Sequence, residues 1–426
     1  MKYDNQVFQT YLEILKEELI PALGCTEPIA VAFAAAKARE VLGKMPERMI
    51  ARCSGNIVKN VKGVIVPMTK NLRGIAAAAI LGAVGGNASK GLEVLADIKE
   101  EDLIRTQELL LKHMCEQEIL ETPAKLHIII EAYIGEHSAK VEILHTHLGL
   151  VHIEKDGQTV FDIPHDAAEE EEGELDRSSL NIAEIYVFAN NVEISDVMPI
   201  LEKQVRYNTS ISRVGLNESY GANIGKTLLE TYGCDVKIRA KAAAAAGSDA
   251  RMGGCELPVV INSGSGNQGM TVSLPVIEYA RDMKVSDEKL YRALCMSNLV
   301  AIHQKSKIGR LSAYCGAVSA AAGAGAGIAY LMDMNVYEIS ETIISTLANV
   351  SGIVCDGAKA SCAAKIASSV DAAIMAVEMT NHGRSFRSGE GIVKNDVEST
   401  IESVTRMARE GMRETDEEIL KIMIDQ

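Results

Sequence analysis

A stretch of 22 residues from Leu311 to Met332 carries no formal charge and contains the run Gly-Ala-Gly-Ala-Gly. A segment of this length either spans a membrane or lies buried inside a protein. Its residues are mostly alanine and glycine, which favour lipid far less than leucine, isoleucine or phenylalanine do. Small residues also let neighbouring helices pack closely. The stretch therefore predicts a buried helix in a bundle and not a membrane span.

The charge and the aromatic content of the chain argue against nucleic acid as a partner. The net charge is −15 at pH 7, so no basic surface is available to neutralise phosphates. The chain has no tryptophan and only 4% aromatic residues, which leaves few platforms for stacking bases. We therefore expect no binding to nucleic acid.

The cysteine content and the N-terminal sequence indicate the cellular compartment in which the protein is expected. Nine cysteines are scattered over the chain and do not resemble a disulfide framework. The first residues lack the basic region and apolar stretch of a secretory signal. We expect a cytoplasmic protein.

The pattern of residues divides the chain into two kinds of structure. Residues 125–162 alternate in the manner of strands, with Asp156-Gly157 at a turn, and predict an antiparallel meander. Residues 49–67 are also β-branched and alternating, which predicts further strand. Beyond residue 180 the periodicity is helical almost throughout.

These patterns predict an α+β fold. With 426 residues, two domains are expected. We assign residues 1–45 and 181–426 to a large, mostly helical domain and residues 46–180 to an inserted smaller α/β domain that contains the antiparallel sheet. The acidic run of residues 169–174 predicts a solvated linker at the domain boundary.

A glycine-rich segment, Gly264-Ser-Gly-Asn-Gln-Gly269, matches the dinucleotide-binding fingerprint. A dinucleotide fold would need strands alternating with helices afterwards, whereas the following residues are helical. Its glycines let backbone N–H groups converge at a helix start, where an anion such as a substrate carboxylate is stabilised. A plain turn is the alternative. The candidate binding residues are Ser263, Ser265, Gly266, Asn267 and Gln268.

Three cysteines in the last third of the chain lie among small residues. They are Cys315 in Ser-Ala-Tyr-Cys-Gly and the two ends of Cys355-Asp-Gly-Ala-Lys-Ala-Ser-Cys362. Thiolates are the preferred ligands of iron–sulfur clusters, and three of them would leave one iron without a protein ligand. The spacing is wider than in common zinc and ferredoxin sites, so three buried core residues are the alternative.

Five segments, in this order along nearly the whole chain, resemble the L-cysteine desulfidases, which are relatives of the α chain of iron–sulfur-dependent L-serine dehydratases. They are Gly24-Cys25-Thr26-Glu27-Pro28, Ser54 to Asn60, Ser263 to Gly269, Gly309 to Gly316 and Cys355 to Cys362. The chain departs from the dehydratases in three ways. The last two cysteines are closer together, no histidine lies beside Cys25, and the chain ends in Gln426 and not in cysteine.

The resemblance implies a [4Fe-4S] cluster in the helical domain, bound by Cys315, Cys355 and Cys362, with the fourth iron open to substrate. It makes Cys25 the base that removes the α-proton. We expect the helix that starts there to lower the pKa of the Cys25 thiol. Thr26, Glu27 and Asn56 would bind substrate together with the Ser263 to Gly269 segment, although the first two could merely cap the helix.

The implied activity is β-elimination of L-cysteine to sulfide, ammonia and pyruvate, with the open iron as Lewis acid. L-Serine dehydration on the same scaffold is the nearest alternative, and a non-catalytic iron–sulfur sensor or sulfur-transfer protein is another. A pyridoxal enzyme would need a Schiff-base lysine, for which the sequence does not distinguish Lys226, Lys305, Lys307 and Lys359. The expected partners are a small amino acid and, in a homo-oligomer, further copies of the chain.

Overall fold

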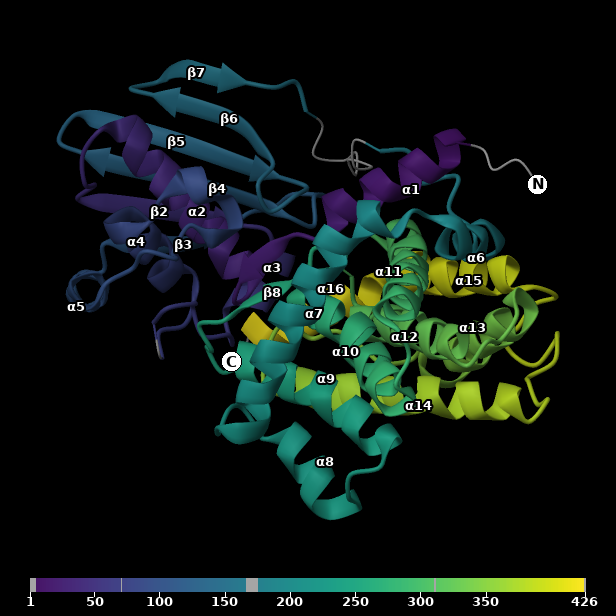
Figure 1. Cartoon of the computed structure of the whole chain (residues 1–426). Coiled ribbons are helices and arrows are strands. Elements are labelled where there is room, and N and C mark those ends of the chain that lie inside the picture. Colours follow the sequence, from purple (N-terminus) through teal and green to yellow (C-terminus); the bar gives the residue numbers. More distant parts are fainter. Residues whose placement is uncertain (1–4, 70, 166–174, 310–311, 425–426) are drawn as a thin grey trace.

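The computed structural model describes residues 5–69, 71–165, 175–309 and 312–424 (Figure 1). The predicted α+β fold is confirmed, with a sheet beside a larger set of helices. Within those ranges no helix is both long and apolar enough to cross a membrane. The acidic run of residues 169–174 lies outside the described residues, as does Leu311 at the start of the uncharged stretch.

A six-stranded sheet has the order β3-β2-β4-β5-β6-β7. The strands are β2 (Arg48–Cys53), β3 (Cys115–Ile119), β4 (His127–Ile134), β5 (His137–Leu144), β6 (Leu150–Lys155) and β7 (Gln158–Asp162). β2 and β3 are parallel, and all other neighbours are antiparallel, so the predicted meander is confirmed as β4 to β7. Buried Ile128 and Ile130 of β4 lie opposite buried Ile143 and Val141 of β5, which fixes the register.

The strand expected over residues 49–67 is wrong in its second half. β2 ends at Cys53, and α3 (Gly55–Val61) follows as a short helix. Ile57 and Val61 lie one helical turn apart and are both fully buried, so a helix places them on one face. At the junction the Ser54 hydroxyl donates to the Lys125 carbonyl oxygen at 2.7 Å.

Two alanine-rich helices lie together beside the sheet. α2 (Thr26–Leu42) packs on β4 and β5 and against α4 (Ile75–Gly85). A Cβ atom at Gly82 would lie 2.2 Å from the Ala32 carbonyl oxygen, so the two helix backbones are almost in contact. The chain between α4 and β3 forms η1 (Ala88–Glu93) and α5 (Glu100–Leu111).

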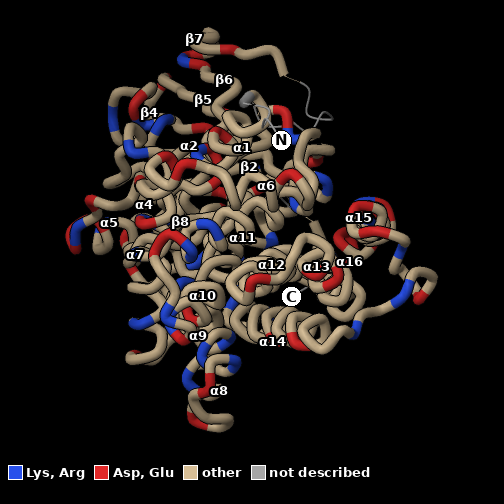
Figure 2. Tube along the Cα trace, turned by 45° about the vertical axis from the view of Figure 1, so that its right-hand side comes forward, with Lys and Arg blue, Asp and Glu red and all other residues tan. Residues whose placement is uncertain are grey.

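The helical part surrounds α12 (Gly316–Leu331), which is buried from Ala317 to Leu331 and packs against α10, α11, α13 and α14. Figure 2 shows α12 without charged residues. The buried helix expected from the uncharged stretch is therefore present. The other helices are α1 (Asn5–Glu18), α6 (Ile182–Asn191), α7 (Ile194–Asn217), α8 (Ile224–Tyr232), α9 (Val236–Met252), α10 (Gly266–Met283), α11 (Asp287–Ile308), α13 (Val336–Val350), α14 (Cys362–Asn381), α15 (Val397–Arg406), η2 (Met407–Gly411) and α16 (Arg413–Ile424).

A two-stranded antiparallel ladder joins the N-terminal segment to the helical part. β1 (Pro21–Leu23) pairs with β8 (Pro258–Val260), with Pro21 opposite Val260. The start of α2 is thereby held beside the start of α10.

The division into domains stays a prediction. α1 contacts α7 and α11, in keeping with a helical domain that includes the N-terminus, whereas α2 packs on the sheet. We propose that the sheet-bearing unit begins at α2 and not after residue 45.

The contact between α2 and α4 can be tested with Gly82→Ala. Alanine favours an exposed helix by about 1 kcal/mol, but here its methyl group would enter the Ala32 backbone. We expect a net loss of about 1–3 kcal/mol in the free energy of unfolding, measured in urea. Gly352→Ala is the control, because nothing lies within 4 Å of its Cβ position. Equal effects of the two substitutions would contradict the close approach.

Candidate functional site

One pocket lies where the starts of α2, α10, α12 and α14 meet the last turns of α11. Its volume is about 100 Å³, far smaller than a site for a drug-sized ligand. The pocket therefore suits a small molecule.

The pocket brings together most of the residues singled out from the sequence. Those that line it are Cys25, Glu27, Ser265, Asn267, Gln268, Cys315, Cys355 and Cys362. Four others, Thr26, Asn56, Ser263 and Gly266, are close in the chain but are not among the lining residues.

A short backbone pairing brings two of the cysteines together. Tyr314 and Val354 form an isolated antiparallel bridge. The Cys315 N–H donates to the Ile353 carbonyl at 3.1 Å, and the Cys355 N–H donates to the Ala313 carbonyl at 2.6 Å. Cys315 and Cys355 are 40 positions apart in the sequence, but each directly follows one of the two bridged residues.

The third cysteine opens α14. Cys362 is the first residue of that helix, and its thiol contacts the Gly357 carbonyl oxygen at 3.6 Å. Gly357 has φ +93°, and a Cβ atom there would lie 2.3 Å from the Lys59 carbonyl oxygen of α3. Only glycine fits this position, so α3 shapes the loop that carries Cys355 and Cys362.

Burial favours the protonated form of two of these thiols, Cys315 and Cys362. It raises the pKa of Cys315 to about 12, and the neighbouring Cys355 raises it further. Burial also raises the pKa of Cys362. Metal binding to such thiols must therefore release protons.

The pocket offers three thiols as donors for the implied cluster. The described residues contain no group of three His, Cys, Asp or Glu side chains placed to hold a single metal ion. In a [4Fe-4S] cluster each thiolate binds a different iron, so the three sulfurs need not converge on one point. Three thiols lining one pocket fit that donor chemistry.

Cys25 precedes α2 as its N-cap residue and is almost fully buried. The expectation of a lowered pKa is wrong, because burial raises the pKa of Cys25 to about 12. The nearby Arg251 guanidinium opposes this shift, and Glu27 adds to it. Loss of solvation therefore outweighs the helix N-terminus, and Cys25 is a thiol at neutral pH.

The residues after Cys25 connect α2 to the α10 segment. The Thr26 hydroxyl lies 3.1 Å from the Gly264 carbonyl oxygen and 3.1 Å from Glu27 Oε2. Burial raises the pKa of Glu27, whereas Arg251 and the Thr26 hydrogen bond lower it. Thr26 thus links the start of α2 to the segment before α10 and is not itself among the lining residues.

The start of α10 rests on buried amides. Ser263 has φ +50°, and its hydroxyl donates to Asn262 Oδ1 at 2.9 Å. Asn262 Nδ2 donates to Asn298 Oδ1 at 3.0 Å, and Asn298 is paired through both amide atoms with Gln204. Gln268 lines the pocket, and its buried Oε1 accepts no hydrogen bond from any described residue.

Five lining residues with polar or charged side chains were not predicted as site residues. They are Asn60, Arg251, Lys305, Ser312 and Tyr314. Arg251 Nε donates to the Gly24 carbonyl at 2.9 Å, and its Nη1 lies 3.4 Å from Asn267 Oδ1. The sequence signal that could have identified Arg251 is a charged residue at the end of the alanine-rich helix α9. Of the four lysines considered, only Lys305 is among the pocket residues.

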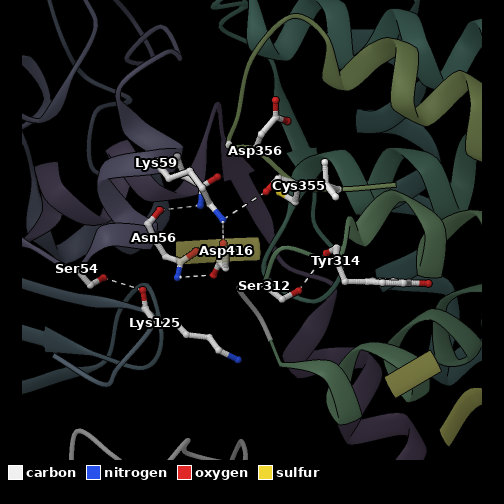
Figure 3. A network of polar contacts seen from close by, with 12 residues as sticks. Ser54, Asn56, Lys59, Lys125, Ser312, Tyr314, Cys355, Asp356 and Asp416 are labelled. Atoms are coloured by element: carbon white, nitrogen blue, oxygen red, sulfur yellow. Dashed lines mark hydrogen bonds and ion pairs between the residues drawn. The ribbon is translucent and has the colours of Figure 1, made fainter. Parts of the chain in front are cut away.

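A buried ion pair lies behind the cysteine loop (Figure 3). The Lys59 side chain is 2% exposed and pairs with Asp416 of α16, and Nζ lies 3.5 Å from the Cys355 carbonyl oxygen. Asn56, expected to bind substrate, instead donates to Asp416 Oδ2 at 3.2 Å. Its neighbour Asn60 lines the pocket. The C-terminal helix is thus tied to α3 and to the cysteine loop.

The chain is similar to one known protein family and to a set of relatives that match it over nearly its whole length. Residues 89–421 match the family model described as serine dehydratase alpha chain. A UPF0597 protein of Lachnoclostridium phytofermentans is 60% identical over 98% of this chain and 100% of its own length. UPF0597 proteins of Desulfitobacterium hafniense and Treponema denticola are 50% and 47% identical, and each match covers 100% of this chain and 99% or more of the relative.

The pKa of Cys25 can be tested by alkylation with iodoacetamide. With a pKa of about 12, roughly one Cys25 in ten thousand is a thiolate at pH 8. We expect its rate to be at least about a hundredfold below that of exposed Cys234 and to keep rising above pH 9. Mass spectrometry of the two peptides measures both rates. A rate for Cys25 that levels off below pH 8 would show a stabilised thiolate instead.

The Lys59–Asp416 pair can be tested with Asp416→Asn. The substitution leaves a buried ammonium without its counter-ion, which typically costs about 3 kcal/mol in the free energy of unfolding. We also expect faster proteolytic cleavage within α16. Glu417→Gln, on the exposed side of the same helix, is the control and should change stability by less than about 0.5 kcal/mol. Indistinguishable variants would mean that the ion pair does not hold α16.

Proposed function

The chain belongs to the serine dehydratase alpha chain family, a family of lyases, and we propose that it catalyses iron–sulfur-dependent β-elimination of L-cysteine to sulfide, ammonia and pyruvate. One observation carries this proposal: two cysteine segments distant in the sequence line a single small pocket together with Cys25 and the start of α10.

Cys315, Cys355 and Cys362 would hold the [4Fe-4S] cluster. When bound, the cluster supplies a Lewis acid, because an iron without a protein thiolate withdraws electron density from the substrate group that it binds. Cys315 is buried, and Cys355 and Cys362 are partly buried, so the cluster would be largely enclosed by protein. The ion pair of Lys59 with Asp416 supports the Cys355 loop from the side of α3.

The start of α10 would bind the amino acid. Backbone N–H groups at a helix start favour an anion, which places the substrate carboxylate near Ser265. Asn267 and Gln268, in the first turn, line the same pocket and offer amide groups to the polar ends of the substrate.

Cys25 would remove the α-proton after releasing its own thiol proton to water. Arg251 lowers the pKa of Cys25 against the effect of burial and is the group that stabilises its thiolate. The α-proton then passes to Cys25 Sγ, the electron pair of the Cα–H bond forms the double bond, and the β-substituent leaves. The released aminoacrylate hydrolyses to pyruvate and ammonia in water.

L-Serine is the alternative substrate, with water as the leaving group, and the name of the matched family supports it. A sensor or sulfur-transfer protein would use the same three cysteines but would produce no pyruvate. The small volume of the pocket supports a small-molecule reaction over docking of a protein.

The test is an anaerobic assay after reconstitution with iron and sulfide. We expect sulfide and pyruvate from L-cysteine in equal amounts, and loss of both products and of bound iron in Cys355→Ser. Exposed Cys234→Ser is the control and should keep both. Pyruvate from L-serine alone would transfer the proposal to the dehydratase reaction. No product from either amino acid, despite a full cluster, would refute an elimination.

A further inference from the structure

Lys305 is a buried lysine without a counter-ion. It lies in the last turns of α11, its residue is 3% exposed, and it lines the pocket. Across the part of the chain that the structure describes, its ammonium forms no ion pair and no hydrogen bond. A buried, unpaired charge is costly, so a partner from outside the chain would explain its position.

The surroundings of Lys305 favour an anion. Lys59 and Lys125 are close enough to lower its pKa, and Cys315 and Cys355 raise it, while burial has the largest effect. The resulting pKa of about 8 leaves most molecules protonated at pH 7. Lys59 already has Asp416 as its partner, so Lys305 remains the lysine of the pocket that is available for a ligand.

A second unpaired group lines the same pocket. Gln268 is almost fully buried, and its Oε1 accepts no hydrogen bond from the described residues. It lies in the first turn of α10, whose N-terminus also favours negative charge. An unpaired cation and an unpaired acceptor in one small cavity match the two charged ends of a zwitterion.

We propose that Lys305 binds the carboxylate of the amino-acid substrate and that Gln268 Oε1 accepts a hydrogen bond from its α-ammonium group. This inference rests on the proposed function, because it names the groups that recognise the substrate in the same pocket. Lys305 would contact the carboxylate from α11, and the backbone N–H groups would do so from the start of α10. The site thus selects a free α-amino acid over an amide or a peptide.

Calorimetry with the anaerobically reconstituted protein tests the proposal through two unreactive probes. L-Alanine and L-alaninamide both lack a leaving group and differ only in the carboxylate. We expect the wild-type protein to bind L-alanine at least about tenfold more tightly, since a buried charge-assisted hydrogen bond contributes that much or more. Lys305→Met should abolish this preference, and Gln268→Leu should weaken both probes to a similar extent.

Two further variants make the result decisive. Lys307→Met is the matched control, because Lys307 lies on the same helix but pairs with Glu398 at 3.7 Å, outside the pocket. It should keep the preference of the wild-type protein. If Lys305→Met does not fold or does not hold the cluster, Lys305→Arg keeps the charge and should retain a preference for L-alanine.

Several outcomes would overturn the proposal. They are an unchanged preference in Lys305→Met, an equal affinity of the wild-type protein for the two probes, and no binding of L-alanine by the wild-type protein. Unchanged binding with lost turnover would make Lys305 a proton-transfer group instead. Conversely, carboxylate-dependent binding through Lys305 without turnover of L-cysteine or L-serine would leave this inference standing and refute the proposed function.

Discussion

The pocket depends on the close approach of helix backbones around α12. A Cβ atom at Gly323 would lie 2.5 Å from the Ser297 carbonyl oxygen of α11, and one at Gly327 would lie 2.8 Å from Val276 Cγ2 of α10. Larger residues would separate α10, α11 and α12 by a side-chain diameter. The helix ends that converge on the pocket would then no longer meet. The alanine and glycine content that argued against a membrane span is therefore what brings the pocket residues together.

Buried charge is concentrated at this convergence. Arg251, Lys305 and Lys59 are each almost fully buried, and all three adjoin the pocket or the cysteine loop behind it. Arg251 and Lys59 have protein partners, which lowers the cost of their burial. Lys305 has none among the described residues, and hydrophobic packing would be served better by a neutral side chain. The substrate carboxylate proposed as its ligand would account for its burial.

The sequence predicted what depends on local pattern and missed what depends on tertiary burial. Period-two alternation identified β4 to β7, and the uncharged stretch identified α12, because both signals are contained in consecutive residues. A strand was expected after residue 53, but the structure has the helix α3 there. A helix places Ile57 and Val61 on one face, where both are buried. The pKa of Cys25 was predicted in the wrong direction because the helix N-terminus is visible in the sequence, whereas desolvation is not. The sequence did not distinguish Lys305 from three other lysines, because only the fold shows that it is buried in the pocket.

The sheet-bearing part of the chain contributes residues to the pocket and shapes the cysteine loop beside it. Asn60 of α3 lines the pocket, and the Lys59 backbone leaves room for no side chain at Gly357. Lys59 then joins the Cys355 loop to Asp416 of the C-terminal helix. Any group that binds to Cys355 and Cys362 stabilises the loop in this conformation, and the docking of α3 and α16 stabilises the same conformation. By linkage, each of these events favours the other. The buried Lys59 ammonium thus lies between the Cys355 loop and the C-terminal helix and contacts both.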